Sequence, residues 1–184
     1  MIRPAKPEDA AAVAPLMILA MGHIAGIFAQ SEKHEDAIPF FDAFFRQENN
    51  QYSYVNTLVF ENESGVVGSV TGYDGKLLRA LREPILEELH KSDPGFLPND
   101  ETEAGEYYLD CVNVHPSQQG KGIGQLLITA FCEHACKLGY PRVGLIVDLE
   151  NPAAKKLYEK LGFTVAGKKE FMGHQYEHMV RNMD

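Results

Sequence analysis

The residues best placed to do chemistry belong to a short glycine-rich turn with glycines at positions 120, 122 and 124. An apolar, strand-like segment, Tyr107–Val114, comes before the turn, and helical spacing of apolar residues begins at Ile123. Because glycine carries no side chain, successive backbone N–H groups in such a turn can converge on one point. The following helix N-terminus adds the positive end of its dipole. The turn therefore predicts a site for a phosphate group.

Two common phosphate motifs do not fit this turn. A Walker A loop needs a lysine followed by serine or threonine, whereas Gly122 follows Lys121. A dinucleotide fingerprint needs a third glycine three positions after Gly124, where the chain has Leu127. Nucleotide binding through this turn is therefore not expected. A strand-to-helix turn without a ligand remains an alternative.

A second motif follows about thirty residues later. Asn151 is a good helix N-cap, Pro152 suits the first helical position, and Gly162 suits the end of that helix. Asn151 and Tyr158 are seven residues apart, so they return to nearly the same helix face. An apolar run over residues 143–148 precedes this helix. The order strand–helix–strand–helix is therefore expected.

In this order and spacing, the two motifs resemble those of the GCN5-related N-acetyltransferase (GNAT) superfamily. The Gln-x-x-Gly-x-Gly pattern at 119–124 is similar to the coenzyme A pyrophosphate loop of that superfamily. The stretch that begins at Asn151 and ends with Glu-Lys-Leu-Gly-Phe at Phe163 is similar to its next motif. The opening Arg3-Pro4-Ala5 before a Glu-Asp-Ala helix start is similar to its N-terminus. The resemblance implies one α/β (α+β) domain over residues 1–184. It also implies a mixed, mostly antiparallel central sheet of about six to seven strands flanked by helices.

The resemblance implies a reaction and the residues that would carry it. An acetyl group would move from acetyl-CoA to an amine of a small molecule, peptide or protein by direct attack in a ternary complex. Tyr158 would protonate the leaving thiolate, although an aromatic packing residue is the alternative there. The residues that the resemblance assigns to coenzyme A are Val112, Asn113 and Val114 on the strand, Gln119, Gly120, Lys121, Gly122, Ile123 and Gly124 in the turn, and Asn151.

The general base departs from the family pattern. Many members carry a glutamate on the strand before the turn, at a position that corresponds approximately to Tyr108. Strand alternation predicts that Asp110 faces the same side as Tyr108 and Val112. Asp110 is the candidate base, or a group that binds a cationic amine, and a hydrogen-bonded structural aspartate is an equal alternative. His34 and His174 are second candidates.

A function of another class also follows from that departure. The chain would then be a non-catalytic acyl-CoA-binding regulatory or interaction module of the same fold. Absence of the usual glutamate favours this module, whereas the presence of both Asn151 and Tyr158 favours the enzyme.

Composition limits the remaining classes. A net charge of −9 over 184 residues argues against general nucleic-acid binding and is compatible with a cationic acceptor. No apolar run approaches the ~20 residues of a membrane span, and no signal peptide is recognisable. Three scattered cysteines suggest reduced thiols in the cytoplasm. No metal is expected, because Cys132, His134 and Cys136 lack a second ligand cluster. A homodimer is left open.

Apolar spacing predicts the remaining elements by residue range. Helices are expected over 8–29 and 36–49, and a hairpin over 54–61 and 66–73. Between the third and fourth strands lies an insertion at about 76–106, which would form an acceptor wall, a surface elaboration or a dimer contact. The last two strands are expected over 163–169 and 175–181. On the last of them, alternation places His174, Tyr176 and His178 on one face.

Overall fold

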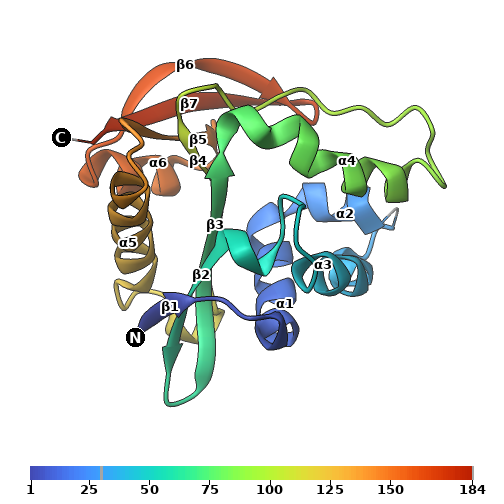
Figure 1. Ribbon diagram of the computed structural model, residues 1–184, viewed down its shortest axis with the longest axis horizontal. Coiled ribbons are helices and arrows are strands. Elements are labelled where there is room, and N and C mark those ends of the chain that lie inside the picture. Colours follow the sequence, from blue (N-terminus) through green and yellow to red (C-terminus); the bar gives the residue numbers. More distant parts are fainter. Residues whose placement is uncertain (30, 184) are drawn as a thin grey trace.

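The computed structural model describes residues 1–29 and 31–183, which form one seven-stranded sheet between two layers of helices (Figure 1). The strand order is β1-β2-β3-β4-β5-β7-β6, and all neighbours are antiparallel except β4 and β5. This confirms the predicted mixed, mostly antiparallel sheet. The strands are β1 (Ile2–Pro4), β2 (Thr57–Asn62), β3 (Gly65–Asp74), β4 (Tyr107–Val114), β5 (Arg142–Asp148), β6 (Thr164–Phe171) and β7 (His174–Asn182).

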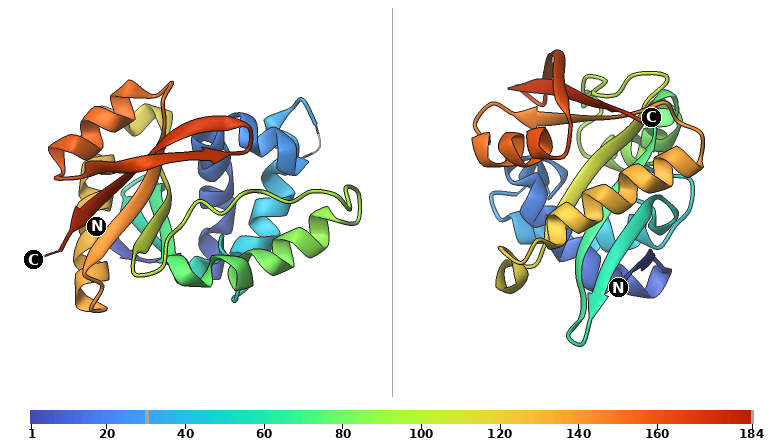
Figure 2. Two further views of the ribbon diagram at one scale, coloured as in Figure 1. Left: turned by 90° about the horizontal axis from the view of Figure 1, so that it is seen from above. Right: turned by 90° about the vertical axis from the view of Figure 1, so that its left-hand side faces the viewer.

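The helices divide between the two faces of the sheet (Figures 1 and 2). One apolar core joins α1, α2, α3 and α4 to Val59 of β2, and a second joins α5 and α6 to β3, β4 and β5. Among the described residues, none of the helices is long and apolar enough to cross a membrane. The α-helices are α1 (Ala10–Met21), α2 (His23–Ala29), α3 (Ile38–Phe45), α4 (Leu78–Leu89), α5 (Ile123–Lys137) and α6 (Pro152–Lys160).

The sheet opens between its two parallel strands. β4 and β5 pair only through Tyr107 with Val143 and Tyr108 with Gly144. Beyond these pairs, β4 continues to Val114 along β3 alone. The distal part of β4 therefore has a side that β5 does not cover.

Several predicted elements have different bounds in the structure. The helix expected over 8–29 is broken at Gly22, whose φ is 54°, into α1 and α2. The helix expected over 36–49 keeps only Ile38–Phe45 as α-helix, after a 3-10 turn at His34–Ala37. The first hairpin strand starts at Thr57, since Tyr54–Asn56 forms a 3-10 turn in which Ser53 accepts from the Val55 N–H.

The 76–106 insertion is one helix followed by an extended return segment. α4 passes through Pro84 without ending. The return segment then crosses back to the sheet (Figure 2), where the Thr102 hydroxyl donates to the Gly75 carbonyl at 2.6 Å. No strand forms over residues 90–106.

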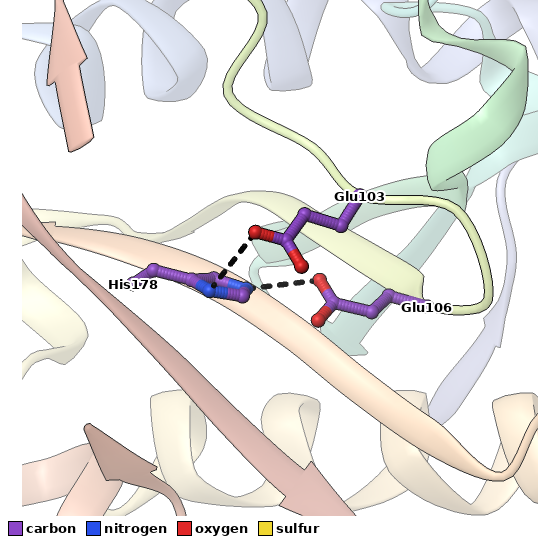
Figure 3. Close-up of side chains that lie close together, drawn as sticks. All are labelled: Glu103, Glu106 and His178. Atoms are coloured by element: carbon purple, nitrogen blue, oxygen red, sulfur yellow. Dashed lines mark hydrogen bonds and ion pairs between the residues drawn. The ribbon is translucent and has the colours of Figure 1, made fainter. Parts of the chain in front are cut away.

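A charged cluster fixes the end of the insertion to β7 (Figure 3). His178 lies between two carboxylates, with Nε2 3.0 Å from Glu106 Oε2 and Nδ1 3.6 Å from Glu103 Oε1. Arg142 Nε approaches Glu106 at 3.4 Å and Lys169 Nζ approaches Glu103 at 3.2 Å. Two cations thus face two carboxylates, and the cluster holds the insertion against the sheet.

Candidate active site

A cavity of about 790 Å³ brings the two sequence motifs together. It borders the uncovered side of β4 and is lined by the glycine-rich turn, by the start of α6, and by residues of α1 and the insertion. The residues of the two motifs and of β4 that line it are Tyr108, Asp110, Cys111, Val112, Asn113, Val114, Gln119, Gly120, Gly122, Ile123, Gly124, Asn151, Ala154, Leu157 and Tyr158.

The glycine-rich turn has the geometry of an anion cradle. Gly120 and Gly122 have φ values of 75° and 79°, a region that side chains rarely adopt, and Gly122 is the N-cap of α5. The first hydrogen bond of α5 runs from Leu126 N–H to the Gly122 carbonyl. The backbone N–H groups of residues 123–125 therefore have no intrahelical acceptor, and they border the cavity together with the positive end of the helix dipole.

Two polar residues of the turn differ in position, since Gln119 lines the cavity and Lys121 does not. The Gln119 amide donates to the Val114 carbonyl at 3.1 Å and ties the turn to β4. Lys121 is exposed, its ammonium donates to Gln118 Oε1 at 2.8 Å, and it is not among the described residues that line the cavity. A role for Lys121 in binding would be at the rim.

The backbone of β4 offers donors on its uncovered side. His115 N–H donates to the Val67 carbonyl of the neighbouring strand at 2.8 Å. Antiparallel ladders alternate, so Asn113 also turns its backbone groups toward β3, and Val112 and Val114 turn theirs toward the opening. The Asn113 side chain is buried against β3, where its Oδ1 accepts from the Ser69 hydroxyl at 2.9 Å.

The second motif forms the opposite wall. Asn151 caps α6, with its Oδ1 accepting from the Ala154 N–H at 3.1 Å, so the side-chain NH2 group is left as a donor. Tyr158 lies two turns along, with its ring edge-on to Phe163 at 5.8 Å. Tyr158 is buried, and this burial raises the pKa of its phenol. A phenol with a raised pKa keeps its proton at neutral pH and can donate it.

Asp110 sits in a β-bulge that the sequence does not reveal. β3 pairs Thr71 with Cys111 and Gly72 with Leu109, so Asp110 is the extra residue of β4. Because of this bulge, the prediction that Asp110 and Val112 face the same side of the sheet is wrong. Asp110 shares the face of Tyr108, but Val112 packs on the opposite face with the core of α5.

The Asp110 carboxylate is half-buried among polar side chains. Oδ2 accepts from the Tyr73 hydroxyl at 2.6 Å and from the Gln51 amide at 3.4 Å. Burial raises the pKa of this carboxyl, while the Tyr73 hydrogen bond and the Arg82 charge oppose that rise. The environment thus favours a carboxyl group that can take up a proton.

Glu101 is a lining residue that the sequence patterns did not single out. It comes from the return segment of the insertion and forms a buried ion pair with Arg82 of α4. Burial raises the pKa of Glu101 to about 7, against the opposing effect of Arg82. A run of acidic residues in an irregular segment, Glu101, Glu103 and Glu106, was the available signal, and it does not say which one faces the cavity.

The remaining candidate bases lie elsewhere. His34 is exposed in a 3-10 turn, and His174 Nδ1 lies 3.4 Å from Asp148 Oδ2. Neither belongs to the described lining of the cavity, whereas Tyr176 does. Tyr108 also lines the cavity, with its ring centroid 5.9 Å from that of Tyr73.

Comparison with known proteins agrees with this geometry. Over 67 residues the chain is 43% identical to mycothiol acetyltransferase of Mycobacteroides abscessus, a match that covers 36% of this chain and 22% of that protein. The chain therefore spans about a fifth of the length of such relatives. A crystal structure of an acetyltransferase is 29% identical, with a TM-score of 0.82 and all of both chains covered. An N-acetyltransferase from Staphylococcus aureus Mu50 shares the fold, at 24% identity and a TM-score of 0.81 over 98% and 99% of the two chains.

A family model covers most of the chain as well. It matches residues 23–163, which include the glycine-rich turn, Asp110, Asn151 and Tyr158. The chain belongs to the acetyltransferase (GNAT) family.

Proposed function

We propose that this chain is an acetyl-CoA-dependent N-acetyltransferase that acetylates an amine of a small molecule, peptide or protein. One observation carries the proposal. A single cavity joins the αL glycine turn, the uncovered edge of β4, a half-buried carboxyl group and a buried phenol. These are the parts that a thioester, an amine and the transfer of two protons require.

The donor half of the cavity fits a long thioester with a pyrophosphate. Free N–H groups at the start of α5 suit the pyrophosphate, and Val112 and Val114 suit the amide-rich arm. The Asn151 amide NH2 group adds a donor on the facing wall. When bound, acetyl-CoA supplies the acetyl thioester.

The chain supplies the proton transfers. Asp110 accepts a proton from the acceptor nitrogen, whose lone pair is then free to form the new N–C bond. As the C–S bond breaks, the Tyr158 hydroxyl donates its proton to the sulfur, and the second proton of the acceptor nitrogen passes to the phenolate as the amide forms. The Tyr158 phenol carries its proton at neutral pH, so that proton is available for this step.

A thiol-release assay tests the proposal. Purified protein is mixed with acetyl-CoA and a panel of primary amines, and free coenzyme A is measured together with acetyl-CoA binding by calorimetry. Release with at least one amine, reduced in Tyr158→Phe while acetyl-CoA still binds, is the expected result. Tight binding with no release across the panel would instead support a non-catalytic acyl-CoA-binding module.

We also propose a reducing compartment, the cytoplasm, for this protein. In support, Cys111, Cys132 and Cys136 are free thiols, with Cys136 exposed. Alkylation of the protein as it is isolated, followed by mass spectrometry, tests this: three alkylated cysteines are expected, and an oxidised Cys136 would contradict it.

A further inference from the structure

Two carboxylates line the cavity, one from β4 and one from the insertion, and the part of the cavity that they border is called the acceptor half here. These are Asp110, which is half-buried, and Glu101, which is buried. A polar chain connects them: Gln51 donates to Asp110, and the Arg82 Nε donates to Gln51 Oε1 at 3.4 Å. Arg82 in turn pairs with Glu101. The two carboxylates are therefore parts of one network.

This network has more negative than positive charge. Arg82 is its single cation, and it also lies 3.6 Å from Asp100 at the rim. Among the described residues that line the cavity, neither lysine nor arginine is present. Since an uncompensated buried charge is costly, the network favours an added proton or a bound cation. The pKa values of Asp110 and Glu101 are both raised for the same reason, because burying a carboxylate charge costs free energy.

Apolar and aromatic side chains complete this half of the cavity. They come from the end of α1, from α2 and from the last two strands, and their apolar surface suits the carbon skeleton of an acceptor. These residues are Leu19, Met21, Ile24, Phe171 and Tyr176.

We propose that the acceptor enters as a cation, a protonated amine on an apolar skeleton with no carboxylate beside the nitrogen, and that Glu101 together with Asp110 selects it. The inference rests on the proposed acetyl transfer. The ammonium group compensates the excess negative charge of the network. It then gives one proton to the Asp110 carboxylate, which becomes a carboxylic acid while the nitrogen keeps the freed electron pair. Glu101 is a specificity-determining residue in this scheme.

Calorimetry on the protein loaded with coenzyme A tests the charge preference without turnover. The probes are two pairs of equal size, 2-phenylethylamine with 2-phenylethanol and hexylamine with hexan-1-ol, together with phenylalanine. We expect at least one amine to bind roughly tenfold or more tightly than its alcohol, and 2-phenylethylamine to bind more tightly than phenylalanine. If neither amine binds more tightly than its alcohol, or if phenylalanine binds as well as 2-phenylethylamine, the proposal is overturned.

A variant ties the preference to Glu101. In Glu101→Gln the preference for amine over alcohol should fall several-fold, with coenzyme A affinity unchanged. Glu83→Gln, an exposed position on α4, is the matched control and should retain the wild-type preference. A folded Glu101→Gln protein with the full preference would remove Glu101 from acceptor selection. Thermal melting checks that each variant is folded. The comparison of amine with alcohol on the wild-type protein tests the charge preference without relying on any variant.

Failure of this inference is distinguishable from failure of the proposed function. If amines bind preferentially but acetyl-CoA releases no thiol, acetyl transfer fails while the charge preference stands. If thiol is released with phenylalanine as readily as with 2-phenylethylamine, acetyl transfer stands while the charge preference fails.

Discussion

The Tyr73 hydroxyl of β3 donates a 2.6 Å hydrogen bond to Oδ2 of Asp110, which lies in the bulge of β4. The bond fixes the carboxylate across the two strands and stabilises its charged form. Burial acts in the opposite direction on the pKa of Asp110. Tyr73 thus positions the candidate base and limits the rise of its pKa.

Tyr73→Phe should separate these two effects. Loss of the hydrogen bond removes an influence that lowers the pKa of Asp110, so that pKa should rise further. Since the base acts in its ionised form, the acidic limb of the kcat profile should move to higher pH. The measurement is kcat against pH with one reactive amine. Tyr54→Phe, an equally sized change at a tyrosine that bonds to exposed Glu48, is the control and should leave the profile in place. If the pH profile of kcat in Tyr73→Phe is the same as in the wild type, this hydrogen bond has only a structural role.

Asp110→Asn should remove the base while keeping the shape of the side chain. General base catalysis contributes about 10²–10⁴-fold, so we expect kcat to fall by at least ~10²-fold. The KM for acetyl-CoA should not change, because the proposed donor contacts come from the turn, from the backbone of Val112 and Val114, and from Asn151. Glu63→Gln in the exposed β2–β3 turn is the control. Turnover within a few-fold of wild type would exclude Asp110 as the base.

The glycine-rich turn was predictable from sequence because its determinants are local. The positive φ of Gly122 and the helical spacing after Ile123 both belong to one short stretch. The Asp110 bulge was not predictable, since it depends on register against Thr71 and Gly72, about forty residues away. Alternation within one strand cannot reveal an extra residue in a ladder.

Glu101 was hidden for a different reason. It belongs to a segment without regular secondary structure, so no periodicity assigns it a face. Its position is fixed by Arg82, nineteen residues earlier on α4. The helix break at Gly22 was also missed, although glycine commonly ends a helix, because apolar residues resume at Ile24 and favoured one continuous helix.

Substitution by alanine should have different effects at Gly122 and at Gly124. At Gly122 the φ of 79° strains any side chain, so Gly122→Ala should destabilise the fold by about 1–2 kcal/mol. Gly124 lies within α5, and an added Cβ would meet only Val114 Cγ2 at 3.8 Å, so Gly124→Ala should fold normally. Its methyl group would crowd the donor site, and the KM for acetyl-CoA should rise several-fold. Chemical denaturation and acetyl-CoA titration of both variants measure these effects. Wild-type donor affinity in Gly124→Ala would place the pyrophosphate away from this turn of the helix.

Burial of Glu101 should make stability depend on pH, because it raises the pKa of this carboxyl group against the opposing effect of Arg82. The pKa of Glu101 is raised from its usual value near 4.5 to about 7, so the folded protein binds more protons than the unfolded chain between these values. Stability from this group is fully present below about pH 4.5 and is lost as pH rises through 7. For a buried group this amounts to the order of 1–3 kcal/mol.

Glu101→Gln should flatten that dependence. The neutral amide cannot titrate, so the difference in free energy of unfolding between pH 5 and pH 8 should shrink. Urea denaturation of wild type, Glu101→Gln and the control Glu83→Gln at both pH values measures this difference. An unchanged difference in Glu101→Gln would mean that Glu101 is already fully ionised at pH 5, with Arg82 outweighing the effect of burial. Asp110 would then be the single proton acceptor in the network.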